Sequence, residues 1–501
     1  MKKLTETQRN RWAFSLGTVG RDMTYSLFTL YLMVFINYTK SLSDAQFAVI
    51  GVIFVVCRIY DALIDPFIGG IVDRTRTRFG KFKPYILAGM IFAAIDFILL
   101  FSLPIYGWAF VAFLAAGYVV FSTFYSINDI AYWGMLPALS SETAERHRLV
   151  SLSNICGGAG TAMCVALVPM LTAGDRTIGG SAVRAYTVIA VVTAVLFVGF
   201  QSITLVWVKE PRAALDEPQA EKLGFKETLQ TVIRNDQLLW ASVVLLIQCV
   251  FGNLCTAGLS MAYVYLVYGY DGVLVPLASA GGVSAMFVTL FLPKILKKIS
   301  RRRLMRIGCA AMFVGAAVLI VSGLMPREPQ LPGFLVYTFA SFFTIGGGVA
   351  FYQVLFIDIA NIVEYNEWKT GRRSEGLIFS LRPVMVQIGS AFVQLIIMAI
   401  FLALGITQVN RGISDLENEA QRGLINAEEK LARIKEILAA VPNGKTFALL
   451  LCMALLPAVI ALAGYWIYKR KFKLDEAAYD KILAELETRK AEEKEGEGAR
   501  V

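Results

Sequence analysis

Two aspartates within one apolar stretch are spaced as a small-cation site requires. Asp61 and Asp65 are four residues apart in residues 55–66, so a helix places both carboxylates on one face. Burying two acids in a bilayer is costly unless a proton, a metal cation or a basic partner compensates their charge. The pair therefore predicts a cation site that takes up a proton or, if the ion is Na⁺, uses Asp61 and Asp65 as metal ligands.

A second polar set shares one helical face in a later apolar run. Ser126, Asp129 and Trp133 are spaced three and four residues apart, so one stripe offers a hydroxyl, a carboxylate and a flat aromatic face. A carboxylate accepts hydrogen bonds from sugar hydroxyls, and an indole covers the C–H face of a sugar ring. The set therefore favours a sugar ligand, with ordinary packing as an equal alternative for Trp133.

Two arginines beside acids complete the candidate charges. Arg21 precedes Asp22 in the first apolar run, where it would hold that acid in place or bind an acidic substrate. Arg58 lies one turn before Asp61. The alternative is that these four residues pair only to fix helices together. Because ionisable groups inside membrane spans are costly and usually functional, we expect a functional role for Arg21 and Asp22.

A charged segment after a later apolar run suggests a gate. Glu364 lies near the end of that run, and Arg372 and Arg373 follow in a short loop of alternating charges. Ion pairs between such groups would close one side of a cavity. We therefore predict a gating role for Glu364, Arg372, Arg373 and Arg58, with a solvated loop as the alternative.

The composition is that of a membrane protein. The chain has 501 residues, of which 56% are hydrophobic and 17% charged, and its mean hydropathy is +0.60. Apolar runs recur along it, each near the ~20 residues needed to cross a bilayer, without the period-two alternation of barrel strands. The net charge of +10 comes from short loops, which argues against a nucleic-acid partner. We predict an all-α membrane protein.

We predict twelve transmembrane helices in two six-helix halves. The halves cover 1–208 and 236–468, joined by a cytoplasmic middle loop at 209–235 and followed by a charged cytoplasmic tail at 469–501. An external insertion at about 408–444 carries an apolar helical stripe, which predicts either an amphipathic hairpin against the outer face or a solvated insertion. The predicted spans are 12–36, 45–72, 84–102, 107–138, 148–172, 184–208, 236–268, 273–296, 305–325, 332–363, 374–404 and 445–468.

Lysines and arginines set the expected orientation. They concentrate in alternate short loops, such as residues 73–83, while the loops between are poor in basic residues. Basic loops remain on the cytoplasmic side. We therefore expect a multi-pass protein of the cell inner (plasma) membrane with both termini cytoplasmic.

Four short blocks, at residues 58–66, 73–84, 367–371 and 389–392, carry a specific resemblance to a known family. The chain resembles the melibiose permease-like glycoside–pentoside–hexuronide:cation symporters of the major facilitator superfamily, over about 10–404. This resemblance implies the major facilitator fold and a cation site formed by Asp61, Asp65 and Ser126. The candidate substrate-binding residues are Arg21, Asp22, Tyr25, Asp129, Trp133, Asn154 and Gln387.

Three departures from the family pattern shape the expected chemistry. Ile64 stands where the pattern has an amide among the sodium ligands, which tilts the coupling ion towards H⁺. Gln387 replaces a lysine and Asn154 replaces an arginine, so positive charge is lost near the cavity. We therefore expect a glycoside other than melibiose.

The resemblance implies import of a sugar or glycoside, including pentosides and hexuronides, coupled to H⁺ or Na⁺ by alternating access. Cation-coupled transport of a lysolipid or another amphipathic organic solute is an alternative. A membrane enzyme is a weaker one, because the sequence shows no metal-ligand cluster, nucleophile motif or nucleotide loop. We expect a monomer with membrane lipids and a small sugar as partners, and no cofactor besides the coupling ion.

Overall fold

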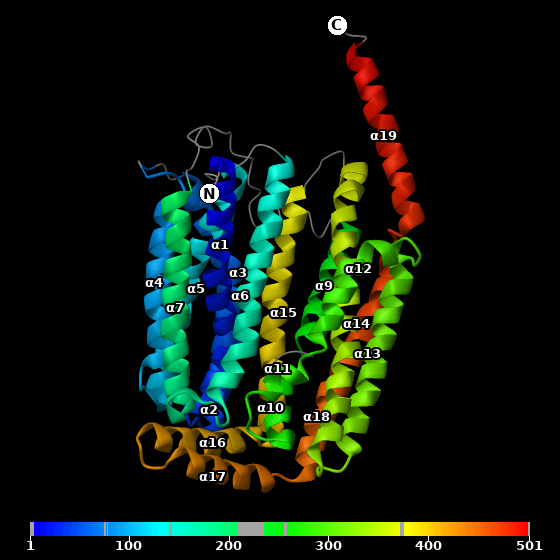
Figure 1. Ribbon diagram of the computed structural model, residues 1–501. Coiled ribbons are helices and arrows are strands. Elements are labelled where there is room, and N and C mark those ends of the chain that lie inside the picture. The colour runs from blue at the N-terminus through cyan, green and yellow to red at the C-terminus, as the bar shows by residue number, and fades with distance from the viewer. Residues whose placement is uncertain are drawn as a thin grey trace. The chain divides into compact units, whose positions relative to one another are not determined.

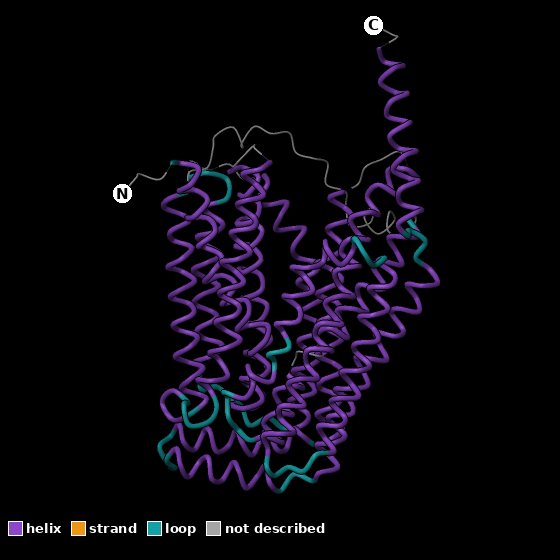
Figure 2. The backbone as a smooth tube through the Cα atoms, turned by 45° about the vertical axis from the view of Figure 1, so that its right-hand side comes forward, coloured by secondary structure: helices purple, strands orange, loops and turns teal. Residues whose placement is uncertain are grey.

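The computed structural model describes residues 5–74, 77, 79–139, 143–208, 235–254, 258–370 and 375–498, so most of the predicted middle loop 209–235 lies outside them. Apart from one isolated β-bridge between Thr77 and Gly80, the regular structure of these residues is helical (Figures 1 and 2), which confirms the all-α fold class. The helices are α1 (Glu6–Ser26), α2 (Leu32–Thr39), α3 (Asp44–Arg74), α4 (Lys83–Ser102), α5 (Gly107–Leu139), α6 (Thr143–Thr172), α7 (Ala182–Trp207), α9 (Asp236–Leu254), α10 (Gly258–Tyr268), α11 (Leu274–Ala278), α12 (Gly282–Leu296), α13 (Arg301–Leu324), α14 (Gln330–Thr370), α15 (Glu375–Leu404), α16 (Ile406–Gln421), α17 (Ala427–Ala439), α18 (Asn443–Lys471) and α19 (Glu476–Gly498).

Ten of the helices in the described residues are long and apolar enough to cross a membrane. Two more predicted spans are present in interrupted form. The span 12–36 begins in α1, passes through a π-helical turn at Leu27–Tyr31 and continues as α2. The span 273–296 is divided between α11 and α12 by a break at residues 279–281. Together these account for the twelve predicted spans.

The helices group into two compact units. The first contains α1 to α7 together with Met261–Leu277 and Gln394–Thr446. The second contains α9, Ala278–Val393, most of α18, and α19. The boundary between units therefore falls inside α15 and inside α18, so the C-terminal end of α15 and the N-terminal end of α18 group with the N-terminal helices.

Glycines allow the helices of the first unit to pack closely. A Cβ atom added to Gly20 of α1 would lie 2.5 Å from the carbonyl oxygen of Leu196 on α7. A Cβ atom added to Gly89 of α4 would lie 2.6 Å from the carbonyl oxygen of Phe124 on α5. Such contacts are possible only where the side chain is a hydrogen atom, so both positions fix the distance between neighbouring helices.

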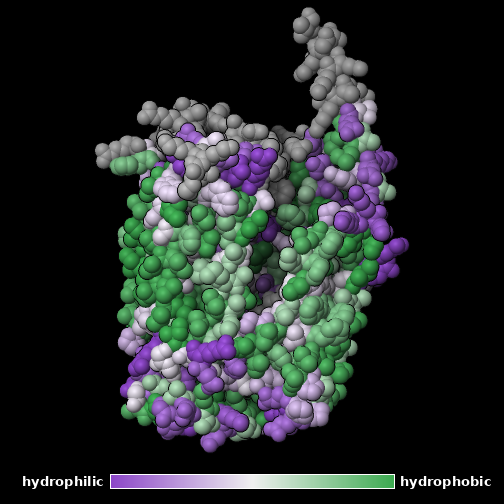
Figure 3. All heavy atoms as spheres, viewed as in Figure 1, coloured by the Kyte–Doolittle hydropathy of each residue, from purple (hydrophilic) through white to green (hydrophobic). Residues whose placement is uncertain are grey.

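Each unit has its own apolar core and an apolar exterior. Phe14, Tyr132 and Met135 belong to the core of the first unit, and Phe251 and Phe351 to that of the second. Many large apolar side chains are nevertheless exposed, and Figure 3 shows them covering the outer faces of the long helices. A bilayer is the solvent in which such faces are stable.

The insertion after α15 forms a pair of helices, α16 and α17, which is the predicted hairpin (Figure 1). The two helices are joined by a turn at Gly423, whose φ is +75°. Leu416, Ile434 and Leu438 of the predicted apolar stripe are buried, whereas Leu424 is 68% exposed because it lies in the turn. The burial of these three residues favours the hairpin over a solvated insertion.

Candidate functional site

Arg21 of α1 joins two acids that come from different helices. Its Nη2 lies 2.7 Å from Asp22 Oδ1, and its Nη1 lies 2.9 Å from Asp129 Oδ1 on α5. The arginine side chain is 6% exposed, whereas the Asp22 and Asp129 side chains are 28% and 39% exposed. The guanidinium is thus buried behind two carboxylates that solvent can reach. Carboxylate oxygens accept several hydrogen bonds each, so both acids retain capacity for a polar ligand.

Aromatic rings orient the same cluster. The Arg21 Cζ lies 4.8 Å from the ring centroid of Trp133 and 5.2 Å from that of Tyr132, within the range of cation–π attraction. The Trp133 side chain also hydrogen-bonds to Asp129, one turn earlier on α5. These contacts hold the half-buried Trp133 ring beside the two acids.

A glycine of α6 makes room for Asp22. A Cβ atom added to Gly157 would lie 2.0 Å from Asp22 Oδ2, so only glycine permits this approach. A Cβ atom added to the next residue, Gly158, would meet nothing within 4 Å. The predicted Asn154 lies three residues before Gly157 and is exposed, so it shares that side of α6. Sequence reasoning missed Gly157, because nothing in a lone glycine reveals which side chain it faces.

Asp61 of α3 is buried, with 5% of its surface exposed, and is held mainly by a hydroxyl. Ser122 of α5 donates a hydrogen bond to Asp61 Oδ1. The Arg58 Nη1 atom lies 3.9 Å from Asp61 Oδ2, at the outer limit of an ion pair. Asp61 therefore faces neither open solvent nor a tightly bound base. Ser122 lies one turn before Ser126, which is the hydroxyl that the sequence predicts as a cation ligand.

Asp65 connects the cation cluster with the substrate cluster. Its carboxylate interacts electrostatically both with Asp61 and with Asp129. The charge state of either candidate site therefore acts on the other. Ser126 is half-buried on α5, and its role as a cation ligand stays a prediction.

Arg58 lies in the middle of α3 rather than at a helix end. It shares a hydrogen bond with Tyr25 of α1, which is 45% exposed and stacks on Tyr125 at a centroid distance of 5.3 Å. A gate requires a position at the mouth of a cavity. The structure places Arg58 beside Asp61, and its gating role stays a prediction.

The other predicted gate residues belong to the second unit. Glu364 is half-buried in the last two turns of α14, whereas Arg372 and Arg373 lie outside the described residues. At the same end of α14, Lys369 Nζ lies 2.7 Å from Asp236 Oδ1 on α9. This ion pair ties two helices of one unit together, and a gating role for Glu364 stays a prediction.

A buried acid of the second unit is paired much more tightly than Asp61. Asp358 of α14 is fully buried, and its Oδ1 lies 2.7 Å from Arg301 Nη1 on α13. Tyr468 of α18 donates a hydrogen bond of 2.7 Å to Asp358 Oδ2. The Arg301 backbone N–H donates to Glu476 Oε1 of α19 at 2.6 Å. The network joins four helices and leaves no oxygen of Asp358 without a donor.

The remaining predicted substrate residue also lies in the second unit. Gln387 is half-buried on α15. On the same helix, the exposed Arg382 donates hydrogen bonds to the hydroxyl of Tyr352 on α14. A contact of Gln387 with substrate stays a prediction.

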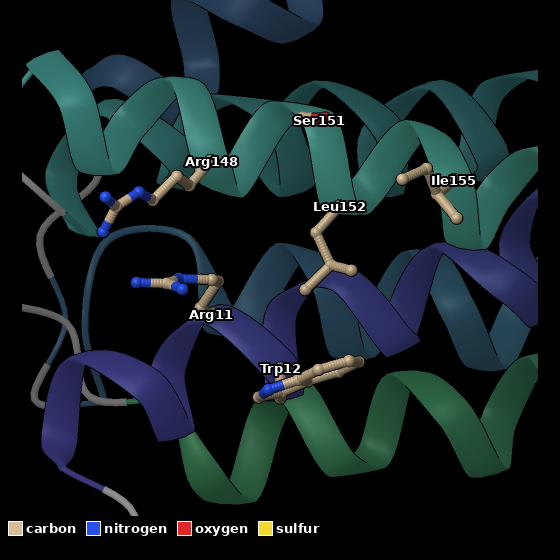
Figure 4. A pocket seen from close by; sticks show the side chains of 6 residues that line it. All are labelled: Arg11, Trp12, Arg148, Ser151, Leu152 and Ile155. Atoms are coloured by element: carbon tan, nitrogen blue, oxygen red, sulfur yellow. The ribbon is translucent and has the colours of Figure 1, made fainter.

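A groove of about 460 Å³ opens on the first unit between α1 and α6 (Figure 4). Arg11 and Arg148 lie at one end of it and Ile155 at the other. Arg11 donates two hydrogen bonds, of 2.6 and 2.5 Å, to the Glu145 carboxylate. Because Ile155 is two residues before Gly157, the groove follows the helices that carry Asp22 and Gly157. The lining residues are Arg11, Trp12, Arg148, Ser151, Leu152 and Ile155.

Among the described residues, no group of three or more His, Cys, Asp or Glu side chains is placed to hold a metal ion. The donor set at Asp61 is two carboxylates and a serine hydroxyl. A proton needs only one carboxylate, whereas Na⁺ would draw further oxygens from backbone or water.

Comparison with known proteins gives a consistent result. Residues 13–476 match the model of a family described as MFS/sugar transport protein. The lactose permease of Leuconostoc lactis is 26% identical over 418 residues, which cover 79% of this chain and 62% of that permease. The lactose permease of Lactobacillus delbrueckii subsp. bulgaricus is 28% identical over 500 residues, covering 96% of this chain and 72% of the relative. The chain thus spans under two thirds of the first of these permeases.

A further relative is matched over nearly its whole length. It is a putative glycoside/cation symporter of Escherichia coli, YagG, which is 22% identical over 96% of this chain and 95% of its own length. Among solved structures, a bacterial homologue of the human lysosomal transporter Spinster superposes with a TM-score of 0.61 at 13% identity, covering 94% of this chain and 99% of that chain. This likeness shows the fold alone. With helices, buried acids and family match in agreement, the chain belongs to the MFS/sugar transport protein family.

Proposed function

We propose that the protein is a symporter that imports a sugar or glycoside together with H⁺ or Na⁺ by alternating access. The observation that carries this proposal is the cluster of Arg21, Asp22 and Asp129, in which two solvent-reachable acids flank a buried base. The relatives named lactose permease and glycoside/cation symporter support a sugar as the substrate.

Sugar binding in this scheme uses hydrogen bonds and one aromatic face. Asp22 and Asp129 accept hydrogen bonds from sugar hydroxyls, and Arg21 holds both carboxylates in position. The Trp133 ring covers an apolar face of the sugar. Hydroxyl-rich ligands suit this arrangement better than the lysolipid alternative, because an acyl chain would offer no donor to the remaining acceptor positions of the two acids.

Coupling in this scheme follows from the position of Asp65. A cation bound at Asp61 and Asp65 removes negative charge that acts on Asp129, so the ion alters the sugar site directly. By thermodynamic linkage, sugar must then change the affinity for the ion by the same factor. A coupling free energy of ~1–3 kcal/mol is sufficient for such an effect.

The expected setting is a cell inner membrane with both termini in the cytoplasm. The basic loop 73–83 supports this orientation, because positive loops are retained on the cytoplasmic side. The same orientation puts α16 and α17 outside the cell. We expect the protein to act as a monomer, since the clusters of the first unit are complete within one chain.

Uptake by purified protein in liposomes tests the proposal. Lactose, raffinose, isoprimeverose and a lysophospholipid are offered under an inward H⁺ gradient, an inward Na⁺ gradient or neither, while external pH is recorded. We expect at least one sugar to accumulate only with a cation gradient, with alkalinisation outside if the ion is H⁺. Uptake of the lysophospholipid with no sugar uptake under either gradient would contradict the proposal.

A further inference from the structure

One side of α16 carries four polar residues spaced four, three and four apart, so that they form a single stripe. The stripe lies against residues 39–44, which connect α2 to α3. Thr407 Oγ1 donates to Asp44 Oδ1 at 2.8 Å, and Arg411 Nε donates to the Leu42 carbonyl at 2.7 Å. The Ser41 backbone N–H donates to Ser414 Oγ at 2.8 Å, and Asn418 Nδ2 donates to the Thr39 carbonyl at 2.9 Å.

These contacts complete hydrogen bonds that the helices themselves leave open. Thr39 is the last residue of α2, and a carbonyl at that position has no partner within its own helix. Asp44 is the first residue of α3. The polar stripe of α16 therefore binds residues 39–44 largely through the backbone groups of that connection, rather than by apolar packing alone.

The inserted helices α16 and α17 also contact the start of α7, through a buried ion pair that links the two helices to each other. Lys430 Nζ of α17 lies 3.0 Å from Glu417 Oε1 of α16, and both side chains are almost fully buried. Glu417 Oε2 accepts from the Ala182 N–H at 2.6 Å, and Lys430 Nζ donates to the Gly180 carbonyl at 2.9 Å. Both charges belong to the inserted helices. If α16 and α17 separated from α7, the ion pair would move into water intact, and neither charge would remain buried without its partner.

The insertion is tightly connected to α15. Gly405 is the single residue between α15 and α16, with a φ of +66°. Just before it, the Phe401 ring stacks with Phe47 of α3 at a centroid distance of 6.3 Å. A Cβ atom added to Gly51 of α3 would lie 1.9 Å from Met398 Sδ. The outer end of α15 and the start of α16 therefore contact α3 as one continuous surface.

Residues 406–439, here called the strap, are therefore bound to the first unit while both of their flanking helices extend into the second. Residues of α15 up to Val393 and of α18 from Phe447 belong to the second unit. We propose that the strap is a latch, which holds the outer ends of α15 and α18 against the N-terminal helices and must release residues 39–44 in each transport cycle. The inference rests on the proposed alternating access.

The exposed contacts of the stripe suit repeated release. Asp44 and Arg411 are 53% and 38% exposed, so water can take over their hydrogen bonds, whereas Thr407, Ser414 and Asn418 are buried. A hydrogen bond that water can replace contributes little net free energy. With Gly405 as the only link, α16 cannot stay bound if the end of α15 leaves α3.

A disulfide across the latch provides the test. In Ser41→Cys/Ser414→Cys, the thiols replace hydroxyls whose oxygens lie 3.1 Å apart. Oxidation should slow lactose uptake by about tenfold or more, because a cross-linked latch cannot open, and dithiothreitol should restore it. The matched control is Gly412→Cys/Ile437→Cys, which joins α16 to α17 inside the strap, where a Cβ at 412 would lie 3.8 Å from Ile437 Cγ2. Full uptake by the oxidised Ser41–Ser414 variant would overturn the latch.

A second measurement separates failure of the latch from failure of the proposed function. Ser414 is fully buried, and its neighbour Asp415 is exposed. A membrane-impermeant maleimide should modify Ser414→Cys more slowly than Asp415→Cys, but to completion, as the latch opens. If Ser414→Cys stays unmodified while Asp415→Cys reacts fully, the strap is a permanent clamp and the proposal is wrong. If no sugar is transported but Ser414→Cys is modified, the proposed substrate fails and the latch stands.

Discussion

Asp61 in the first unit and Asp358 in the second are both buried acids near an arginine, yet their surroundings differ. Asp358 lies 2.7 Å from Arg301 and also accepts a hydrogen bond from Tyr468, so its charge is fully compensated. Asp61 accepts one hydrogen bond from Ser122, and Arg58 is 3.9 Å away. Asp358 is thus a structural component, whereas the buried carboxylate of Asp61 still needs a positively charged partner.

The comparison teaches that the residue types alone do not distinguish a binding site from a helix-joining pair. What distinguishes them is how many donors reach the carboxylate and at what distance. The Arg21 cluster has the features of a binding site, because the Asp22 and Asp129 side chains are paired with a base but remain 28% and 39% exposed.

The largest effect is expected from Asp61→Asn, which removes the charge that calls for a cation. The ratio of internal to external sugar should fall to about 1, since uptake is no longer linked to the ion, while downhill exchange persists. Uptake and counterflow in the same liposomes measure the two quantities. A variant that still concentrates sugar as well as the parent would place the coupling ion elsewhere.

Asp358→Asn should affect stability instead of coupling. It removes the buried carboxylate 2.7 Å from Arg301 and leaves only the part-exposed Glu476, 3.5 Å away, as a counter-charge. This change costs up to about 3–5 kcal/mol and lowers the unfolding temperature of the purified protein. Accumulation per folded molecule should be unchanged. Asp358→Leu combined with Arg301→Met serves as the control, because removing both charges should recover stability. Lost coupling in a stable Asp358→Asn protein would erase the contrast between the two acids.

Ser122→Ala sharpens the comparison by removing the one donor that reaches Asp61. If the coupling ion is H⁺, its apparent affinity should strengthen by up to about tenfold, because the lost hydrogen bond favoured the ionised carboxylate; if the ion is Na⁺, loss of the Ser122 oxygen should weaken its affinity by a similar factor. Ser126→Ala is the matched variant one turn later, and a smaller change is expected from it. The concentration of Na⁺ or H⁺ giving half-maximal uptake decides between the two hydroxyls, and a larger effect at Ser126 would favour the sequence-based assignment.

The smallest effect is expected from Gly157→Ala, which displaces Asp22 without altering any charge. The added methyl group collides with Asp22 Oδ2, so the KM for sugar should rise about three- to tenfold with ion affinity retained. Gly158→Ala, where the methyl group meets open space, should behave like the parent protein. Equal behaviour of the two variants would remove Asp22 from the substrate site.

The fold could be predicted from the sequence because apolar runs of membrane-spanning length are a strong signal. The site could be predicted only in part. Helical spacing indicates that Ser126 and Asp129 share a face, but Ser122 shares it as well, and the choice depends on how far α5 slides along α3. That depth is fixed by contacts such as the 2.8 Å hydrogen bond between the hydroxyls of Tyr60 on α3 and Thr123 on α5, which a single sequence does not reveal.

Arg58 and the inserted helices show the same limit. Mid-helix placement of Arg58 beside Tyr25 depends on packing between α1 and α3. The amphipathic pattern at 408–444 predicted a hairpin, but its binding site consists largely of backbone groups at Thr39, Ser41 and Leu42. Backbone groups carry no sequence signature, so such docking is visible only in three dimensions.

The π-helical turn at Leu27–Tyr31 absorbs one residue more than an α-helical turn holds. Deleting one residue inside this turn would therefore restore an ordinary α-helix and leave Thr39 facing Asn418. Deleting one residue in α2 instead would rotate the helix that follows by about 100° and turn Thr39 away from Asn418, with Arg21 and Asp22 left in place. The same loss of one codon is thus tolerated at one point of this span and separates its two ends at another.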